Sequence, residues 1–325
     1  MKVIAVVKKH YDFIELEEII NRSNSKHLCL CIYTNEKLCN FTKKVAENLH
    51  DKFCVKVEKI ECHFFNLNDV KSGRDIYNSI STFVKEKSIV ALPLANSRYF
   101  VQAAGLFNNS ANAIVFHISD GILDHIPRYK YYLTRCKLNI KGISRSVIQY
   151  INLINKTSDY SYSVFSNYSA FSKETIKISP NFNYKKLTIK NLEIAIPQLR
   201  CNAGLILLMP TKAVNIDLLI SEYKLEDLVD QIIVTAKTGE ITYNKKTYWL
   251  NGPVTAEEML QTGYFHKVYS GPSTAAFYAR QLDSRIRVSM LSTYSERSNI
   301  GYMMDRWLRK EALKNEINYK YLSEK

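Results

Sequence analysis

Residues 2–34 read "KVIAVVKKHYDFIELEEIINRSNSKHLCLCIYT" and contain a short apolar run, an amphipathic segment and a second short apolar run. The two short runs, residues 2–8 and 27–34, are typical of buried strands. Residues 12–23 between them carry apolar side chains at helical spacing, which predicts a helix. A strand, a helix and a strand in this order form the repeating unit of a parallel sheet that is covered by helices.

The same alternation continues to residue 121. We expect further strands at 54–62, 88–95 and 111–118, and further helices at 35–52, 70–87, 97–110 and 144–160. Residues 166–200 are rich in Ser, Asn, Tyr and Lys and lack a compact strand-helix unit, so we expect them to connect two domains. The first domain is therefore predicted to be Rossmann-like and to span residues 1–165.

A second alternation begins after residue 201 and predicts another Rossmann-like domain, residues 201–325. We expect strands at 203–210, 232–237 and 267–271, and helices at 215–231, 255–263, 272–282 and 298–317. The predicted fold class is therefore α/β. Two such domains in series with a terminal helix resemble the GT-B architecture of sugar-nucleotide glycosyltransferases, in which the domains face a central cleft and the C-terminal helix packs back.

Composition narrows the class of protein. The chain has 325 residues, 46% of them apolar, and a net charge of +14, which attracts polyanions.

Its seven cysteines form no CxxC pair, so we expect reduced thiols that pack as small buried hydrophobes, as at Cys29, Cys31 and Cys62. Five apolar residues before Lys8 are too few for a signal peptide, and we expect a cytoplasmic protein.

Several ligand-binding signatures are missing from the sequence. No GxGxxG follows the first predicted strand, no GxxxxGK[ST] occurs, and no DxD-type metal motif is evident. We therefore expect neither a nicotinamide dinucleotide nor a bound metal or other cofactor. The lysines are scattered, with no basic recognition helix or zinc finger, so we expect no nucleic acid partner.

Asp120 is the first candidate for chemistry, in "HISDGILDH", residues 117–125. It follows the fifth predicted strand, at the edge where an open α/β sheet presents its functional groups. Gly121 permits a tight turn and a close approach of substrate, and Asp120 can take a proton from a sugar hydroxyl. The alternative is that Asp120 caps the following helix.

The second candidate site lies in "YSGPSTAAFYA", residues 269–279, where a strand leads into an Ala-rich helix. Ser273 and Thr274 add two hydroxyls to the free amides of a helix N-terminus, which can bind a phosphate. Glu257 starts a helix sixteen residues earlier and can accept hydrogen bonds from a ribose or a base amino group. The alternatives are helix capping by Ser273 and a capping box formed by Thr255 and Glu258.

These residues, in this order, resemble the bacterial sialyltransferases and polysialyltransferases, which transfer sialic acid from CMP-sialic acid on a GT-B fold. That family has a D/E-D/E-G motif whose acid is the base, a glutamate that holds cytidine and a Ser-Ser/Thr pair that binds phosphate. The resemblance implies these roles for Asp120, for Glu257, and for Ser273 with Thr274. Ser119 stands where the first acid of the D/E-D/E-G motif would be.

The family's His-Pro motif, which meets the donor phosphate, is missing. After the strand at 232–237 the chain keeps Lys237 but continues with Thr238, Gly239 and Glu240, and the other strand-to-proline turn is Met209-Pro210. Lys237, or Lys212 in that other turn, would then neutralise the leaving phosphate, or an imidazole would enter from elsewhere. His117 and His266 are the candidates for that imidazole.

The sequence thus predicts an inverting transferase that moves sialic acid from CMP-sialic acid to a galactoside-type glycan acceptor of a capsule or lipooligosaccharide. A transferase for another CMP-sugar, such as Kdo or a sialic-acid relative, and a non-catalytic GT-B scaffold remain open. The positive charge also suits an anionic inner membrane face, to which residues 306–321 could bind peripherally. The other role for these residues, which we favour, is a packed terminal helix with its lysines in water.

Overall fold

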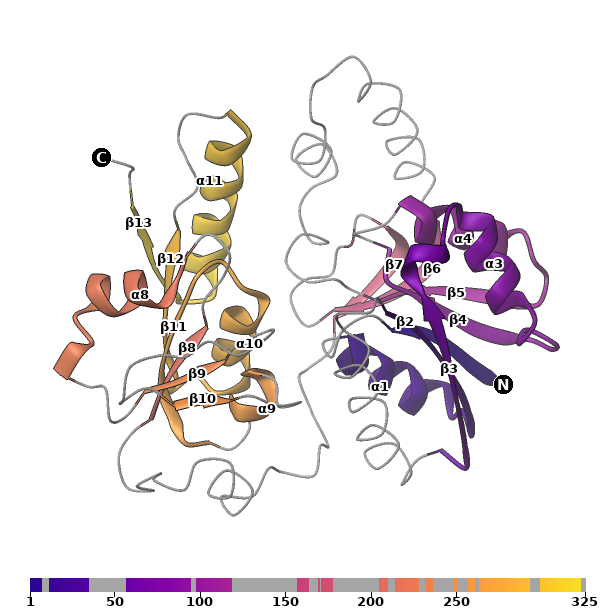
Figure 1. Ribbon diagram of the computed structural model, residues 1–325, viewed down its shortest axis with the longest axis horizontal. Helices are drawn as coiled ribbons and strands as arrows, with labels where there is room; N and C mark the ends of the chain where they lie inside the picture. The colour runs from indigo at the N-terminus through magenta and orange to yellow at the C-terminus, as the bar shows by residue number, and fades with distance from the viewer. Residues whose placement is uncertain are drawn as a thin grey trace. The chain divides into compact units, whose positions relative to one another are not determined.

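The computed structural model divides the chain into two units, Met1–Ser179 and Pro180–Lys325. The division falls within the stretch expected to be a connector, residues 166–200. The structure describes residues 1–7, 12–34, 57–94, 98–118, 157–163, 169, 171–177, 205–209, 214–227, 232–235, 248–250, 256–260, 263–292 and 299–322. Each unit is built on one parallel sheet of its own (Figure 1).

The N-terminal unit contains a seven-stranded sheet with the strand order β3-β2-β1-β4-β5-β6-β7. All its neighbouring strands pair in parallel. The strands are β1 (Lys2–Val7), β2 (His27–Thr34), β3 (Lys59–Asn66), β4 (Ser88–Leu92), β5 (Ala113–His117), β6 (Ser158–Ser163) and β7 (Ser172–Lys177). The order reverses between β1 and β4, which is the switch point of a Rossmann fold.

Helices cover both faces of this sheet. Figure 1 shows α1 (Asp12–Ser23) on one face, with α3 (Gly73–Ser81) and α4 (Arg98–Asn108) on the other. The start of α3 is fixed by a capping box, in which the Ser72 hydroxyl accepts from Asp75 N and the Asp75 carboxylate accepts from Ser72 N. β1 and β4 are buried along almost their whole length, and their sequences are nearly continuous apolar runs. This is expected of strands in a sheet that is covered on both faces.

The C-terminal unit repeats this plan with six parallel strands in the order β10-β9-β8-β11-β12-β13. The strands are β8 (Leu205–Met209), β9 (Ile232–Thr235), β10 (Tyr248–Leu250), β11 (Phe265–Ser270), β12 (Arg287–Ser292) and β13 (Asn318–Tyr321). The helices are α8 (Ile216–Tyr223), α9 (Ala256–Leu260), α10 (Thr274–Leu282) and α11 (Asn299–Lys314). The order reverses between β8 and β11, so this sheet has its own Rossmann switch point. The predicted α/β class with two Rossmann-like units is therefore confirmed.

Two polar strands differ from the sequence-based expectation. β6 occupies residues expected to end the helix at 144–160, and β7 lies inside the expected connector, so the first sheet extends past residue 165. Both strands lack an apolar run because buried hydroxyls join them: Ser161 Oγ lies 2.7 Å from Ser172 Oγ and 3.0 Å from Thr175 Oγ1. The strands β10, β12 and β13 were also not expected.

The described part of α11 is amphipathic. Trp307, Leu308 and Ala312 are buried, whereas Arg309 and Lys310 are exposed. This agrees with the favoured role, a packed helix with its basic side chains in water. Among the described residues, no helix is long and apolar enough to cross a membrane.

Two glycines of the N-terminal unit provide a matched test of its packing. A Cβ at Gly73 would lie 2.3 Å from Gln102 Cβ and 2.7 Å from Tyr99 O, whereas one at Gly105 would meet nothing within 4 Å. We therefore expect Gly73→Ala to lower the free energy of unfolding by about 1–3 kcal/mol. Gly105→Ala should raise it by about 0.5–1 kcal/mol, because Gly is a poor helix former.

Calorimetric unfolding of both variants measures these changes. Both tryptophans of the chain, Trp249 and Trp307, belong to the C-terminal unit, so their fluorescence serves as an internal control. Equal stability of the two variants would contradict the close approach of α3 and α4.

Candidate functional site

The switch point of the C-terminal sheet is the best-defined candidate site. β8 and β11 are neighbours there, and Gly271 N donates a hydrogen bond to Met209 O across their carboxyl ends at 3.2 Å. From β11 the chain passes through Gly271 and Pro272 directly into α10. Ligands of open α/β sheets bind at this position, outside the carboxyl ends of the strands where the order reverses.

The N-terminus of α10 is suited to an anion. Ser273 is its N-cap, and the Ser273 hydroxyl accepts from Ala275 N at 3.3 Å. Thr274 is the first helical residue, and the first turn of α10 contains no acidic side chain. The positive end of the helix dipole is therefore not neutralised by a carboxylate of its own first turn. The body of α10 is buried from Ala275 to Ala279, which holds this N-terminus in place.

The sequence analysis missed Ser270, the last residue of β11. Its side chain is fully buried, and its Oγ has no hydrogen-bond partner among the described residues. Tyr269 packs against Tyr223 of α8, so by strand alternation Ser270 faces the other side of the sheet, which α10 covers. A buried hydroxyl without a partner is costly, so Ser270 is a third hydroxyl available at this switch point. The signal in the sequence was a polar residue that ends a strand just before Gly-Pro-Ser.

Glu257 is the second residue of α9, a helix that packs against α10. The structure thus brings together the two elements that carry Glu257 and the Ser273-Thr274 pair. The side chain of Glu257 is outside the described residues.

His266 lies away from this site. It is exposed near the amino end of β11, about 13 Å along the strand from Ser270 at ~3.3 Å per residue. It contributes to the electrostatics at the carboxyl end of α10. There the Arg285 guanidinium lowers the pKa of the C-cap residue Asp283 to about 2, with a small contribution from His266. The structure therefore does not bring His266 to the predicted phosphate site.

His117, the other imidazole candidate, is a core residue. It is 1% exposed at the end of β5 and packs against the ring of Phe171, with 5.0 Å between ring centroids. Its Nδ1 lies 3.4 Å from both Leu94 N and Leu92 O. These backbone contacts hold the ring between the ends of β4 and β5, so a role as a mobile proton donor is not supported.

Five candidates lie outside the described residues: Asp120, Gly121, Lys212, Lys237 and Gly239. The structure does describe the strands that precede them. Ile118 N bonds to Leu92 O at the carboxyl end of β5, two residues before Asp120. Lys237 follows the end of β9 by two residues. In the sequence, Asp120 and Lys237 therefore follow the carboxyl ends of the interior strands β5 and β9.

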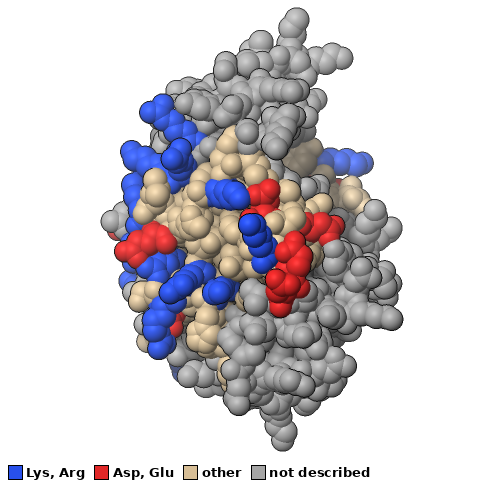
Figure 2. Space-filling model, turned by 90° about the vertical axis from the view of Figure 1, so that its left-hand side faces the viewer, with Lys and Arg blue, Asp and Glu red and all other residues tan. Residues whose placement is uncertain are grey.

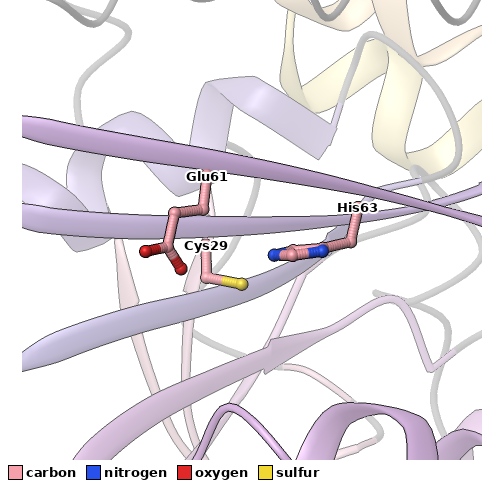
Figure 3. Close-up of side chains that lie close together, drawn as sticks. All are labelled: Cys29, Glu61 and His63. Carbon is pink, nitrogen blue, oxygen red and sulfur yellow. The ribbon is translucent and has the colours of Figure 1, made fainter.

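The cysteines differ in part from expectation. Cys29 and Cys31 are free and buried, but Cys62 is exposed because β3 is an edge strand whose outer face is open. We expected no metal ligands, yet the structure brings together Cys29, Glu61 and His63 (Figure 3). The sequence could not show this cluster, because it depends on the register of β2 against β3.

The strand orders of the two sheets define a protein of two Rossmann-like α/β units. No protein-family model matches the chain, and no curated protein matches it either. Among solved structures, it is similar to a chain described as the spinosyn forosaminyltransferase SpnP. The TM-score is 0.49 and the identity 9%, over 99% of this chain and 86% of that chain.

Ser273 provides a test of the α10 cap. Ser273→Ala removes the acceptor for Ala275 N and should lower the free energy of unfolding by about 1 kcal/mol. Ser273→Asp keeps a capping oxygen and should leave stability within about 0.5 kcal/mol. Urea unfolding followed by Trp fluorescence measures this, because both tryptophans lie in the same unit as α10. Equal losses in the two variants would show that Ser273 is not the cap.

Proposed function

We propose that the protein is an inverting glycosyltransferase of GT-B type that transfers sialic acid from CMP-sialic acid to a galactoside-type acceptor. One observation carries the proposal. Helix α10 starts at the switch point of the C-terminal sheet, and its first turn contains no acidic side chain. An anionic donor is the ligand that such an N-terminus favours. The resemblance of Asp120, Glu257, Ser273 and Thr274 to the sialyltransferase motifs supports the choice of donor.

In the proposed donor complex, the CMP phosphate accepts hydrogen bonds from the first amides of α10 and from the Ser273 and Thr274 hydroxyls. Ser270, the buried last residue of the strand that leads into α10, is an additional donor. Glu257 accepts hydrogen bonds from the ribose or the cytidine amino group. CMP leaves as a phosphate monoester, so negative charge develops where these donors converge, and Lys237 adds a positive charge.

In the proposed reaction, Asp120 accepts the proton of an acceptor hydroxyl as the oxygen attacks the anomeric carbon. The bond from that carbon to the CMP phosphate breaks on the opposite face, which inverts the configuration. Asp120 ends protonated and CMP carries the departing electron pair. Because amides, hydroxyls and Lys237 stabilise the negative charge of the leaving group, the proposal requires no divalent cation in this step.

The basic surface suits a cytoplasmic enzyme that acts on anionic glycans such as capsule or lipooligosaccharide precursors. The net charge is +14, and Figure 2 shows Lys and Arg side chains gathered along one side of a face of the C-terminal unit, with Asp and Glu side chains also present on that face. Arg306, Arg309, Lys310 and Lys314 of α11 are exposed. Peripheral binding to an anionic membrane is the alternative to the favoured role, in which these side chains stay in water.

Nucleotide binding in EDTA tests the donor site. We expect CMP to raise the melting temperature and to bind by calorimetry more tightly than UMP, GDP or ADP. Glu257→Ala should weaken CMP binding at least about tenfold, a cost of about 1.4 kcal/mol that suits the loss of hydrogen bonds to a charged group. Glu258→Ala, at the neighbouring glutamate, is the matched control and should bind as the wild type does.

Ser273→Asp separates binding from capping. It keeps the cap but places a carboxylate beside the phosphate, so CMP binding should be lost while stability is kept. Wild-type protein without preference among the four nucleotides would contradict the proposal.

Turnover tests the base. Asp120→Asn should lower the rate of sialic acid transfer to a galactoside by about 10²- to 10⁴-fold with CMP affinity unchanged. Asp124→Asn, four residues further on, is the control. Transfer by Asp120→Asn at the wild-type rate would exclude Asp120 as the base.

A further inference from the structure

Three potential metal ligands lie together on the N-terminal sheet. The parallel register of β2 and β3 pairs Cys29 with Glu61 and Cys31 with His63. Cys29, Glu61 and His63 therefore point to the same face of the sheet (Figure 3). Their ligand atoms, a thiol sulfur, a carboxylate oxygen and an imidazole nitrogen, all lie within 4.8 Å of one another.

His63 has a nitrogen available for a ligand. Its Nε2 is buried and has no hydrogen-bond partner among the described residues. Figure 3 shows the end of the imidazole ring that is remote from the backbone directed toward the Cys29 sulfur. The ring packs against Phe83, with 4.3 Å between centroids, which limits its rotation. A buried nitrogen without a partner costs free energy, and a bound cation would remove that cost.

Glu61 is already balanced by two lysines. Its Oε2 lies 3.2 Å from Lys2 Nζ, and its Oε1 lies 2.6 Å from Lys59 Nζ. The Lys59 side chain is 62% exposed, so this ion pair is weak and the lysine can turn into water. That movement frees Oε1 for a cation while Lys2 stays in place.

We propose that Cys29, Glu61 and His63 bind Zn²⁺ with the fourth position open to solvent or a small ligand. Thiolate, imidazole and carboxylate together are zinc ligands, and a hard cation such as Mg²⁺ would not select the thiolate. Metal–ligand distances of about 2.0–2.3 Å place tetrahedral ligands about 3.4–3.8 Å apart, so small side-chain rotations close the site. Binding releases the Cys29 proton to solvent, and the thiolate and carboxylate balance the ion's charge.

The site is separate from the proposed transfer reaction. Cys29 and Glu61 are each the third residue of an eight-residue strand, and His63 is the fifth. Cys29 and Glu61 lie toward the amino ends and His63 lies near the middle of β3, so none of them is at the carboxyl edge where the sheet presents substrate-binding groups. The bound ion would join the edge strand β3 to β2, so its expected effect is on the stability of the N-terminal unit.

Zinc binding by the full-length chain tests the proposal. We expect one Zn²⁺ per chain in competition with a chromophoric chelator, and Co²⁺ in its place should give a thiolate-to-metal charge-transfer band. Cys29→Ser and His63→Gln should each weaken Zn²⁺ binding at least about tenfold, and Cys29→Ser should abolish the charge-transfer band. Cys62→Ser is the matched control, because this neighbouring thiol is exposed on the other face of β3.

Three results would overturn the proposal: no Zn²⁺ bound by the wild type, binding that survives either ligand variant, or loss of binding in Cys62→Ser. His63 is half-buried on an edge strand, so His63→Gln should fold even if Cys29→Ser does not. The affinity of the same variants for CMP, titrated in EDTA, should equal that of the wild type. This measurement distinguishes failure of the zinc proposal from failure of the proposed donor site.

Discussion

Parallel pairing on both sides of one buried strand is the constraint on which each unit depends. β1 pairs with β2 on one side and β4 on the other, and β8 pairs in the same way with β9 and β11. Crossover connections between parallel strands are right-handed as a general rule, so a chain that extends the sheet first on one side of the central strand and then on the other covers both faces with helices. Ligands of open α/β sheets bind outside the carboxyl ends of the strands where the order reverses in this way.

The two candidate sites use opposite ends of this arrangement. At the carboxyl ends of β8 and β11, the short turn through Gly271 and Pro272 sets α10 directly over the switch point, and burial of α10 fixes its N-terminus. In the amino half and middle of β2 and β3, strand register alone assembles Cys29, Glu61 and His63. A helix terminus suits an anion and a thiolate-imidazole-carboxylate set suits zinc, so the chemistry proposed at each end follows from backbone geometry.

The apolar central strands and the helices between them could be predicted from the sequence, because burial on both faces leaves continuous runs such as 88–92. Ser273 could be recognised as the start of a helix because its cap is local. The polar strands β6 and β7 could not, because hydroxyl contacts between Ser161, Ser172 and Thr175 replace apolar burial there. The Cys29 cluster needed the register of β2 and β3, which no sequence pattern contains. The burial of Ser270 and His117 depends on the packing of neighbouring elements, although the polar residue before Gly-Pro-Ser marks the position of Ser270 in the sequence.

The central claim is that the C-terminal switch point is where the donor nucleotide binds. Hydrogen exchange of the full-length chain, measured by mass spectrometry with and without CMP in EDTA, tests it most directly. We expect slower exchange in the peptides that contain Gly271 to Ala276, the turn and first amides of α10, with no change in β2 and β3. Protection confined to the N-terminal unit, or CMP binding without protection of the α10 N-terminus, would contradict it.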